Sequence, residues 1–532
     1  MRWRGAQTTI VSALTILLLA VGIWHAASKD RAGDPVRAAA RAGSATAAAR
    51  GASARVAPQA PSDPADPSAL YATVGGSPTG SALPAGFLGL SFEYGALQAY
   101  SGAEPAALDP VFVQLLRNLG QPLVLRIGGN STDATWWPVR GVSRPPGVSY
   151  ALTPAWLASA RALVNELGAK VIVGVNLAAA RPRLSAAEAD ALVQWVGAGH
   201  IAALELGNEP DVYALFPWYR GRRGPVYARS SGYGPAAFTQ EARNVSALLP
   251  SLPLAGPATA KLPWLAGVPA LAAAEPGLRV VTVHRYALQG CLSDASSPAY
   301  PSIDNLLSDR SSAGLAQALA PYIAMAHARG LSFRVDELNS AALAGCLGRA
   351  GVSDTFASAL WMLDVLFNLA RVGVDGVNVH SLPGAGYELF TLSRDARGWH
   401  AFVHPDYYAM LLFAQAFPAG ARLLPVHAPA GPVKVWGTLA PDGHTRVALI
   451  NKSPVPQRVE LQLPPAAGSA EVELLRAPGA WATGGVTLGG QSFGAQTTTG
   501  ALPGPGRLEP VPQLFGWYTI RVPADSAALL TR

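Results

Sequence analysis

Short apolar runs alternate with longer amphipathic segments over most of this 532-residue chain. A run of apolar or β-branched residues that stops at Gly, Pro or Asn predicts a buried strand, whereas apolar residues that recur every three or four positions predict a helix. Eight such strands are predicted after residue 85. They are 86–94, 122–128, 170–176, 201–207, 252–257, 278–285, 331–337 and 375–381.

Amphipathic segments between these strands predict helices at 153–167, 185–196, 314–328 and 353–372, and the last one lies at 404–417. Ser185 and Ser353 are expected to cap the starts of the helices at 185–196 and 353–372. Gly330 and Gly373 are expected to end the helices at 314–328 and 353–372. Eight alternating strands and helices are most simply closed into a ring. The fold class expected for residues 86–418 is therefore α/β, a (β/α)8 TIM barrel.

The pattern changes after residue 418. Short strands separated by Gly and Pro turns predict an all-β domain over 419–532, most simply a β-sandwich. Its predicted strands are 433–439, 445–451, 457–463, 471–475 and 517–522. A further strand-like segment lies within 70–85, before the barrel, and is expected to join this domain.

The first 28 residues begin with basic Arg2 and Arg4 and continue as an uncharged, largely apolar stretch. This pattern is typical of a signal peptide, but its length also approaches that of a membrane span. A cleaved signal and an N-terminal membrane anchor both remain open, and either one predicts export to an extracellular, periplasmic or cell-surface location. Residues 29–69 are rich in Ala, Arg and Pro and predict a disordered linker.

The net charge of +7 is unevenly distributed, since residues 1–69 contribute +4 and the remaining residues only +3. A nucleic-acid partner would require a more strongly basic body, so none is expected. The charge also argues against a strongly basic, heparin-type surface, although a local basic cleft stays open.

Only two cysteines occur, Cys291 and Cys346, and each follows a predicted barrel strand. An exported protein can form disulfides, so we expect these two to join neighbouring active-site loops. The alternative is that both are unpaired, buried, small apolar residues.

Two glutamates stand at the ends of predicted strands. Glu209 follows strand 201–207, and Glu337 ends strand 331–337. The carboxyl ends of the strands form the catalytic face of a TIM barrel, and these two strands are three apart around the ring. Cleavage of a glycosidic bond uses one protonated carboxyl group and one ionised carboxylate. The pair therefore predicts glycoside hydrolysis, whereas two unrelated loop carboxylates would be the structural alternative.

Several motifs around these strand ends resemble glycoside hydrolase family 79, which contains β-glucuronidases and heparanase-like enzymes. The resemblance extends over about residues 86–532. It rests on Leu125-Arg126-Ile127-Gly128-Gly129-Asn130-Ser131, Arg334-Val335-Asp336-Glu337-Leu338-Asn339-Ser340, Gly351-Val352-Ser353-Asp354-Thr355-Phe356 and Gly376-Val377-Asn378-Val379-His380. Leu206-Gly207-Asn208-Glu209-Pro210 resembles the wider clan of retaining glycosidases built on this barrel.

The resemblance implies a retaining mechanism in which Glu209 is the acid/base and Glu337 is the nucleophile. Their carboxyl groups would then lie about 5–5.5 Å apart. Asn208 is expected to hydrogen-bond the sugar 2-hydroxyl.

Other strand-end residues resemble substrate-binding positions of the family. Glu93 is expected to bind sugar hydroxyls, with Asn130 and Ser131 completing the polar floor. The segment that contains Gly386 and Tyr387 resembles the family's carboxylate-binding loop, in which backbone N–H groups and a phenol can hold an anion. The alternative is that this segment is only a glycine-rich turn, with Tyr387 packed against neighbouring side chains.

Tyr286 is expected near the nucleophile, although it could instead form an aromatic wall. His284 and His380 end strands and are expected to face the cleft. No metal set or cofactor motif is recognised, so none is expected.

The expected partner is a β-glucuronide-containing glycan or glycoside. An exo-β-glucuronidase is preferred, because the segment after Glu337 is poor in glycine and the body is weakly basic. An endo-β-glucuronidase of heparan-like polysaccharide and a surface-tethered, non-catalytic carbohydrate-binding protein remain as alternatives.

Overall fold

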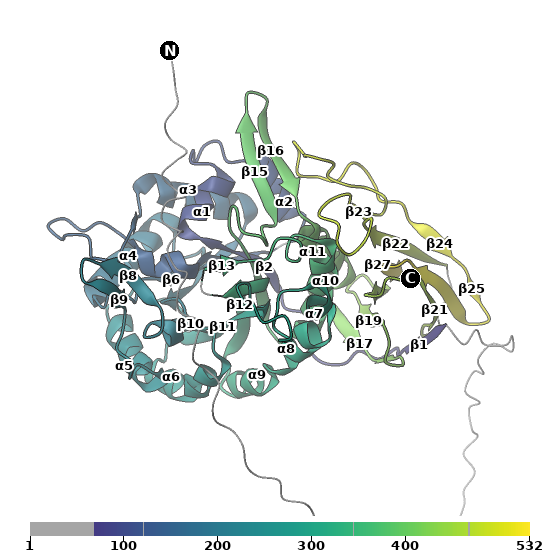
Figure 1. The fold of residues 1–532 in the computed structure, drawn as a ribbon, viewed down its shortest axis with the longest axis horizontal. Coiled ribbons are helices and arrows are strands. Elements are labelled where there is room, and N and C mark those ends of the chain that lie inside the picture. Colours follow the sequence, from purple (N-terminus) through teal and green to yellow (C-terminus); the bar gives the residue numbers. More distant parts are fainter. Residues whose placement is uncertain (1–68, 121, 344, 466–468) are drawn as a thin grey trace, which may run out of the picture. The chain divides into compact units, whose positions relative to one another are not determined.

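Eight parallel strands close into a barrel in the computed structural model, which describes residues 69–120, 122–343, 345–465 and 469–532. The ring closes because β11 pairs with β12 as well as with β10. The helices surround this ring (Figure 1). In order around the barrel, the strands are β2 (Leu88–Glu93), β3 (Val124–Gly128), β6 (Lys170–Val175), β7 (Ile201–Leu206), β10 (Leu254–Thr259), β11 (Leu278–Leu288), β12 (Ser332–Leu343) and β14 (Gly376–Ser381).

The expected (β/α)8 TIM barrel is thus confirmed, and each predicted strand overlaps one strand of the ring. Two strands are longer than predicted. β11 and β12 continue past the barrel rim and stay paired as far as Leu288 and Ala341. The extension of β12 then turns back as β13 (Cys346–Leu347), which is antiparallel to it.

Helices connect the strands of the barrel. They are α1 (Tyr94–Ser101), α2 (Pro110–Arg117), α3 (Pro154–Leu167), α4 (Pro182–Val196), α5 (Pro235–Ser246), α6 (Val268–Ala274), α7 (Ile303–Leu307), α8 (Leu315–Gln317), α9 (Ala320–His327), α10 (Phe356–Arg371) and α11 (Pro405–Ala416). The predicted helices at 153–167, 185–196, 353–372 and 404–417 correspond to α3, α4, α10 and α11, and further helices connect the other strands. The single helix predicted over 314–328 is wrong. It divides into α8 and α9, because Pro321 has no N–H to continue the ladder.

Both predicted serine caps are also wrong. Helix α4 begins at Pro182, and Ser185 lies inside it with its hydroxyl donating to the carbonyl of Asn176 at 2.6 Å. Thr355 precedes α10, whereas the Ser353 hydroxyl accepts from the backbone N–H of Arg349 at 2.9 Å. A serine near a helix start can satisfy other groups, so its position alone did not locate the cap.

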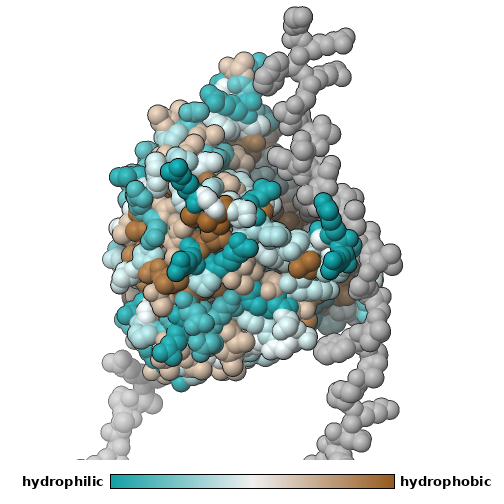
Figure 2. Space-filling view, turned by 90° about the vertical axis from the view of Figure 1, so that its left-hand side faces the viewer, coloured by the Kyte–Doolittle hydropathy of each residue, from teal (hydrophilic) through white to brown (hydrophobic). Residues whose placement is uncertain are grey.

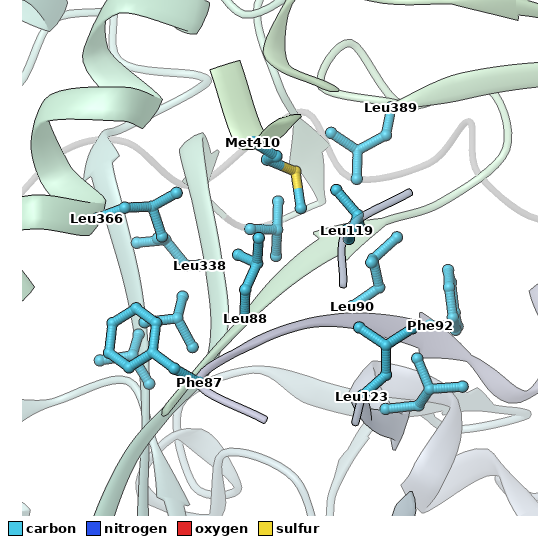
Figure 3. Close-up of a cluster of buried hydrophobic side chains, with 14 of the residues drawn as sticks. Phe87, Leu88, Leu90, Phe92, Leu119, Leu123, Leu338, Leu366, Leu389 and Met410 are labelled. Carbon is cyan, nitrogen blue, oxygen red and sulfur yellow. The ribbon is translucent and has the colours of Figure 1, made fainter. Parts of the chain in front are cut away.

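The core around β2 shows how the barrel is packed. Phe87, Leu88, Leu90 and Phe92 meet side chains from β12, α10 and α11, including Leu338, Leu366 and Met410 (Figure 3). All of these are at most 7% exposed. Burial of one such side chain stabilises the fold by about 1.5–3 kcal/mol. This apolar layer therefore fixes the position of β2, whose last residue, Glu93, lies at the catalytic end of the barrel.

Two mostly antiparallel sheets form the C-terminal domain, as the predicted β-sandwich requires. One contains β18 (Val426–His427), β1 (Leu70–Val74), β21 (Gln457–Gln462), β26 (Trp517–Val522) and β25 (Gln513–Leu514). The other contains β17 (Arg422–Leu424), β19 (Val433–Leu439), β20 (Thr445–Asn451), β27 (Ser526–Thr531), β22 (Ala470–Arg476), β23 (Thr487–Leu488) and β24 (Glu509–Val511).

Strand β1 lies before the barrel in sequence but sits within the first of these sheets, as expected. It pairs in parallel with β21 and antiparallel with β18. Its buried residues Leu70, Ala72 and Val74 belong to the apolar layer between the two sheets. The barrel is therefore inserted between two segments of the same β-domain.

A buried ion pair joins the β-domain to the barrel. Lys452 follows β20 and lies 2.6 Å from a carboxylate oxygen of Asp364 on α10. Ser312 and Trp436 also donate to this carboxylate. These bonds satisfy a carboxylate that is otherwise removed from water, and they fix α10 against the sheet.

The predicted leader, residues 1–28, and all but the last residue of the predicted linker lie outside the described residues. Among the described residues, no helix is both long and apolar enough to cross a bilayer.

Candidate active site

Glu209 and Glu337 meet at the mouth of the barrel. Glu209 lies just after β7, and Glu337 lies in β12. One carboxylate oxygen from each glutamate and one ring nitrogen of His284 all lie within 4.8 Å of one another. The barrel thus brings the two predicted carboxyl groups together, with an imidazole from β11 between them.

Two donors hold the Glu337 carboxylate in place. The Tyr286 hydroxyl donates to Oε1 at 2.6 Å, and Nη1 of Arg126 donates to Oε2 at 2.7 Å. Each oxygen therefore has its own partner, and the carboxylate cannot rotate without breaking one of these bonds. Glu337 is 7% exposed, so the bonds lie in a largely water-free environment.

These neighbours keep Glu337 ionised. Burial by itself would raise the pKa of the carboxyl group. His380, His284 and Arg126 outweigh burial by their positive charge, and the Tyr286 hydrogen bond adds to them, so the pKa of Glu337 is held well below its usual range. An ionised carboxylate at this position is able to act as a nucleophile.

Glu209 is held by its backbone. Its φ of 47° and ψ of 54° lie in the left-handed region, which costs a residue other than Gly about 1–3 kcal/mol. Its N–H donates to the carbonyl of Ala258 at 2.9 Å, which fastens the turn to the end of β10. This turn directs the side chain into the mouth, where it remains 22% exposed.

His284 links the two glutamates. Its Nδ1 lies 2.9 Å from Oε1 of Glu209 and 3.7 Å from Oε2 of Glu337. Burial lowers the pKa of this imidazole, but the charge of Glu337 and the bond to Glu209 outweigh burial and raise the pKa to about 9, against the opposing charge of Arg126. At neutral pH, a proton is therefore present on the hydrogen bond between His284 and Glu209.

Arg126 is the central residue of the site, and sequence reasoning did not identify it as functional. Its guanidinium is fully buried on β3 and, besides Glu337, contacts Ser91, Glu205, Asn208 and His284. Nε donates to Glu205 at 2.8 Å, and Nη2 donates to Oδ1 of Asn208 at 3.0 Å. Nη1 donates to the Ser91 hydroxyl at 3.3 Å, and Nη2 lies 3.2 Å from Nε2 of His284.

A second pair of carboxyl groups lies beneath the site. Glu205 of β7 forms an ion pair with Arg126, and Asp336 of β12 lies 3.7 Å from the same guanidinium. Both carboxyl groups are fully buried. Burial and the negative charge of Glu205 raise the pKa of Asp336 well above its usual range, whereas the charge of Arg126 outweighs burial and lowers the pKa of Glu205.

One signal in the sequence could have located this buried group. Arg126 and Glu205 each interrupt an otherwise apolar strand, and Asp336 lies inside a strand between Val335 and Glu337. A charged side chain is almost never fully buried unless it is paired. Charges in three separate strand interiors therefore indicate partners across the barrel.

Asn208, which is expected to hydrogen-bond the sugar 2-hydroxyl, directly precedes Glu209. Besides accepting from Arg126, its amide Nδ2 lies 3.4 Å from Oδ1 of Asn130. Its backbone N–H donates to Asp133 at 3.2 Å. Asn208 is 5% exposed, so its orientation is fixed from three sides.

Glu93 at the end of β2 is held by the loop after β3. Its two carboxylate oxygens accept from the backbone N–H groups of Asn130 at 3.0 Å and Ser131 at 2.7 Å. Nε2 of His380 lies 3.9 Å from the same carboxylate. Within the described residues, no arginine forms an ion pair with Glu93, so backbone N–H groups and not a guanidinium hold this carboxylate.

Asn130 is exposed at this edge, whereas the Ser131 hydroxyl is used within the protein. It donates to the carbonyl of Gly128 and accepts from the N–H of Tyr94 at 2.7 Å. The structure therefore gives Ser131 a loop-holding role, and Asn130 has the side chain that is accessible.

The segment at Gly386 differs from the expected anion-binding loop. The N–H of Gly386 donates to the carbonyl of Leu347 at 2.7 Å, and those of Gly384 and Ala385 also have acceptors within the protein. Gly386 instead allows close packing, because an added Cβ would lie 3.2 Å from backbone atoms of Gly348 and Arg349. Backbone donation from Gly386 is thus not available to a ligand.

Tyr387 lies on the floor of the site. It is 1% exposed, and its ring lies 5.9 Å from that of Tyr286 and 6.1 Å from that of His380. Its hydroxyl is buried beside that of Tyr286 and makes no well-aligned hydrogen bond among the described residues. Burial and the charge of Glu337 raise the pKa of this phenol above its usual range, so it is protonated and available as a donor.

The two cysteines are joined in the structure. Cys291 follows β11 and Cys346 begins β13, and their Cα atoms are 5.6 Å apart. The disulfide joins the segment after β11 to β13, which pairs with the end of β12. Strand β11 carries Tyr286, and strand β12 carries Glu337.

Among the described residues, one group has the spacing of a metal site, and it consists of Glu209, His284 and Glu337. Arg126 already places a positive charge on Glu337 at 2.7 Å. A cation beside this guanidinium would be repelled, so the donor set fits a metal ion poorly.

Comparisons with solved structures agree with the fold. A 4-O-alpha-L-rhamnosyl-beta-D-glucuronidase from Fusarium oxysporum 12S is 20% identical, with a TM-score of 0.66, and the match covers 87% of this chain and 100% of that chain. A GH51 arabinofuranosidase from Xanthomonas axonopodis pv. citri is 15% identical, with a TM-score of 0.62, over 87% of this chain and 99% of that chain.

A family 44 xyloglucanase from Paenibacillus polymyxa is 12% identical, with a TM-score of 0.55, over 87% and 99% of the two chains. No family model and no curated protein matches the sequence. At these identities, the similarity establishes that the chain has the fold of glycoside hydrolases built from a TIM barrel and a β-domain.

Proposed function

We propose that this protein is a retaining glycoside hydrolase that cleaves β-glucuronide linkages by double displacement. One observation carries the proposal. A carboxylate held ionised by Tyr286 and Arg126 lies beside a second carboxyl group, Glu209, at the catalytic end of the barrel. These are the two groups that glycoside hydrolysis needs.

In the first step, Glu337 attacks the anomeric carbon and forms an ester bond to the sugar, while the bond from that carbon to the leaving oxygen breaks. Glu209 donates its proton to that oxygen, and the proton comes from the hydrogen bond shared with His284. In the second step, Glu209 takes a proton from water, whose oxygen replaces Glu337 on the sugar. Both carboxyl groups then regain their starting states.

The spacing of the glutamates favours retention over inversion. Inverting enzymes keep their carboxyl groups about 6.5–9.5 Å apart, which leaves room for a water molecule beside the sugar. Here a carboxylate oxygen of Glu209 lies within 4.8 Å of one of Glu337. This supports direct attack by Glu337.

Recognition of a glucuronate carboxylate is assigned to the phenols on the floor of the site. The Tyr387 hydroxyl is buried beside that of Tyr286 and makes no well-aligned hydrogen bond among the described residues, so it can turn to donate to a ligand. The Fusarium enzyme is named for its action on a β-D-glucuronide and was solved with Rha-GlcA. Glu93 and Asn208 would bind sugar hydroxyls from the opposite side.

A non-catalytic carbohydrate-binding role fits the site less well. Binding alone would not need Glu337 to be kept ionised in a buried pocket by three positive neighbours. Such arrangements are typical of catalytic groups. Exo-action on a terminal glucuronide and endo-action on a polymer use the same carboxyl groups and differ only in how far the cleft extends.

The first experiment compares aryl β-glycosides. We expect turnover of the glucuronide to exceed that of the glucoside, galactoside and xyloside, and Glu337→Gln to abolish it. A matched change, Glu241→Gln, removes a carboxylate that pairs with Arg229 away from the site and should leave turnover intact. Preferential turnover of the glucoside would contradict the uronate assignment.

The mechanism can be tested separately. A 2-fluoro-glucuronide with a good leaving group should accumulate as an ester on Glu337, visible by peptide mass spectrometry. Proton NMR of the first product should show the β-anomer. An α-anomer as first product would exclude double displacement.

We also propose that the protein is exported, since disulfides persist mainly in oxidising compartments. The disulfide between Cys291 and Cys346 supports this proposal. Secretion of the full-length chain, followed by mass analysis without reductant, would test it.

A further inference from the structure

We propose that the disulfide between Cys291 and Cys346 holds the Tyr387 phenol in the position that recognises the sugar carboxylate, so that the intact disulfide sets the preference of the site for a uronide. The inference rests on the proposed function, because Tyr387 is assigned there to the glucuronate carboxylate. The two cysteines act through Tyr387 and are therefore positioning residues. The strand that transmits their effect is β13.

Strand β13 is short and depends on its neighbours. Its two residues, Cys346 and Leu347, pair antiparallel with the end of β12. A two-stranded pairing of this length is weak by itself. The disulfide adds a covalent link from Cys346 to the segment after β11, and it joins two residues that are 55 apart in sequence. Without the disulfide, β13 would lose the covalent part of its support.

The segment after β11 lies directly against β13. A Cβ added to Gly290 would lie 2.9 Å from the carbonyl oxygen of Cys346, so the two segments approach as closely as a glycine permits. The Cα atoms of Cys291 and Cys346 are 5.6 Å apart. The disulfide thus ties β13 to β11, the strand that carries Tyr286.

Strand β13 also supports the loop that carries Tyr387. The carbonyl of Leu347 accepts from the N–H of Gly386 at 2.7 Å. A Cβ on Gly348, directly after β13, would lie 2.7 Å from the carbonyl carbon of Gly386 and 2.8 Å from the backbone nitrogen of Tyr387. Backbones packed this closely move together. A shift of β13 is therefore passed to Tyr387.

Beyond β13, ring packing and a long hydrogen bond hold Tyr387. Its carbonyl accepts from Nδ2 of Asn339 at 3.4 Å, whereas the same amide donates to the carbonyl of His380 at 2.8 Å. Its ring packs near those of Tyr286 and His380. The position of the phenol therefore depends on ring packing and on the loop that β13 supports.

The catalytic carboxyl groups are held by other elements. Arg126 of β3 and Tyr286 of β11 donate to Glu337. Glu209 is held by the turn after β7 and by its bond to His284. Loss of the disulfide should therefore weaken recognition of the sugar carboxylate and leave the two glutamates in place.

The loops after β3 and β7 also have their own support. The hairpin of β8 (Pro217–Gly221) and β9 (Gly224–Tyr227) follows β7, and its Trp218 donates to the carbonyl of Asp133 at 2.9 Å. The Asp133 carboxylate accepts from the N–H of Asn208 at 3.2 Å. Figure 2 views the side on which β8 and β9 are labelled in Figure 1, and it shows hydrophilic side chains beside hydrophobic ones. Asn208 therefore keeps its orientation when the disulfide is lost.

A double-mutant cycle on the full-length chain tests the proposal. One change replaces Cys291 and Cys346 by Ala, and the other is Tyr387→Phe. For an aryl β-glucuronide, the cysteine change should lower kcat/KM about tenfold, mainly by raising KM, because the phenol is displaced. In the Tyr387→Phe background, the same change should lower kcat/KM by less than about twofold, because the hydroxyl is already absent. Equal losses in both backgrounds would overturn the proposal, since a purely structural role affects both alike.

Reduction of the folded protein gives the same comparison and decides the case in which the alanine variant does not fold. A dithiol such as dithiothreitol transfers two electrons and two protons to the S–S bond, which leaves two thiols, while the dithiol closes to a cyclic disulfide. Turnover of the glucuronide should fall on reduction and return on reoxidation, and Tyr387→Phe should not respond. An unchanged kcat/KM after reduction that thiol titration shows to be complete would contradict the proposal.

Two glycine variants form a matched pair with the disulfide intact. Gly348 and Gly351 have φ values of 82° and 76°, so alanine strains the backbone at both. A Cβ on Gly348 meets the loop that carries Tyr387, whereas a Cβ on Gly351 meets nothing within 4 Å. Gly348→Ala should raise KM for the glucuronide about tenfold, and Gly351→Ala should leave KM unchanged. The same KM in both variants would count against transmission through β13.

The position of Tyr387 can also be followed without turnover. Fluorine NMR of the protein labelled with meta-fluorotyrosine gives a resonance for Tyr387, assigned by its absence in Tyr387→Phe. This resonance should shift on reduction, whereas that of Tyr407 on α11, assigned in the same way, should not. A shift together with no glucuronide turnover by the wild-type chain would reject the proposed function and keep the positioning role. Turnover of the glucuronide with a Tyr387 resonance that does not respond to reduction would do the reverse.

Discussion

The hydroxyl of Tyr286 donates a 2.6 Å hydrogen bond to Oε1 of Glu337, the oxygen that Arg126 does not contact. Tyr286 lies on β11 and Glu337 on β12, and the long parallel pairing of these strands sets the two side chains in register. This bond both orients the carboxylate and favours its ionised form.

Tyr286→Phe removes this bond with almost no change in shape. Hydrogen bonds to charged groups contribute about 1.5–3 kcal/mol, so kcat/KM for an aryl β-glucuronide should fall about 10- to 100-fold. The pKa of Glu337 should rise, which moves the acidic limb of the pH–rate profile to higher pH. Tyr233→Phe, which removes a phenol bonded to Glu241, should leave that limb in place.

Arg126→Lys keeps the positive charge but cannot reach Glu337, Asn208 and Glu205 together. We expect kcat/KM to fall by about 100-fold or more, because the planar fork is what positions the nucleophile. Arg334→Lys is the matched change, since Arg334 is buried at the other end of β12 and bonds to Asn378 and Gly86. It should lower stability while the folded protein keeps its kcat/KM.

Asp336→Asn and Glu205→Gln should differ in stability although both remove a buried carboxyl group. The pKa of Asp336 is raised well above its usual range, so we expect Asp336 to hold the shared proton, and the amide should change the free energy of unfolding by only about 1 kcal/mol. Glu205 is the ionised partner of Arg126, and its loss should cost about 3–5 kcal/mol. Urea unfolding at pH 7 measures both, and equal losses would show that the proton is not on Asp336.

His284 predicts a dependence of stability on pH. Its pKa is raised to about 9 from 6.5, so the folded protein holds this proton more tightly than the unfolded chain does. The resulting stabilisation, on the order of 3 kcal/mol, is complete below about pH 6.5 and is lost as the pH rises through about 9. Urea unfolding between about pH 6 and pH 10 should show this loss in the wild type and not in His284→Gln.

The barrel could be predicted from the sequence because each strand carries its own local signal. β7 and β14 are buried apolar runs that end at polar residues, and their limits differ from the prediction by only a residue. The segments that connect strands at the catalytic end of the barrel gave no comparable hydrophobic pattern in the sequence. The hairpin of β15 (Phe390–Asp395) and β16 (Gly398–Val403) is held by backbone pairing between short, partly exposed strands, and neither strand is a buried apolar run.

Glu209 and Glu337 could be predicted because strand ends have a known place in a barrel. Arg126 was missed, since its importance depends on partners from other strands that meet only after closure. Gly386 was misjudged for a related reason. Whether a backbone N–H is free to bind a ligand depends on the neighbouring loop. Here the N–H of Gly386 donates to the carbonyl of Leu347.

The position of β1 has a consequence for the order of folding. The ribosome makes this strand before any of the barrel, yet its parallel partner β21 begins only at Gln457. Its buried side chains therefore have no sheet to join while the whole barrel is being made. The β-domain can be completed only after synthesis reaches the C-terminal strands, so a barrel that folds first would wait for these distant segments to meet.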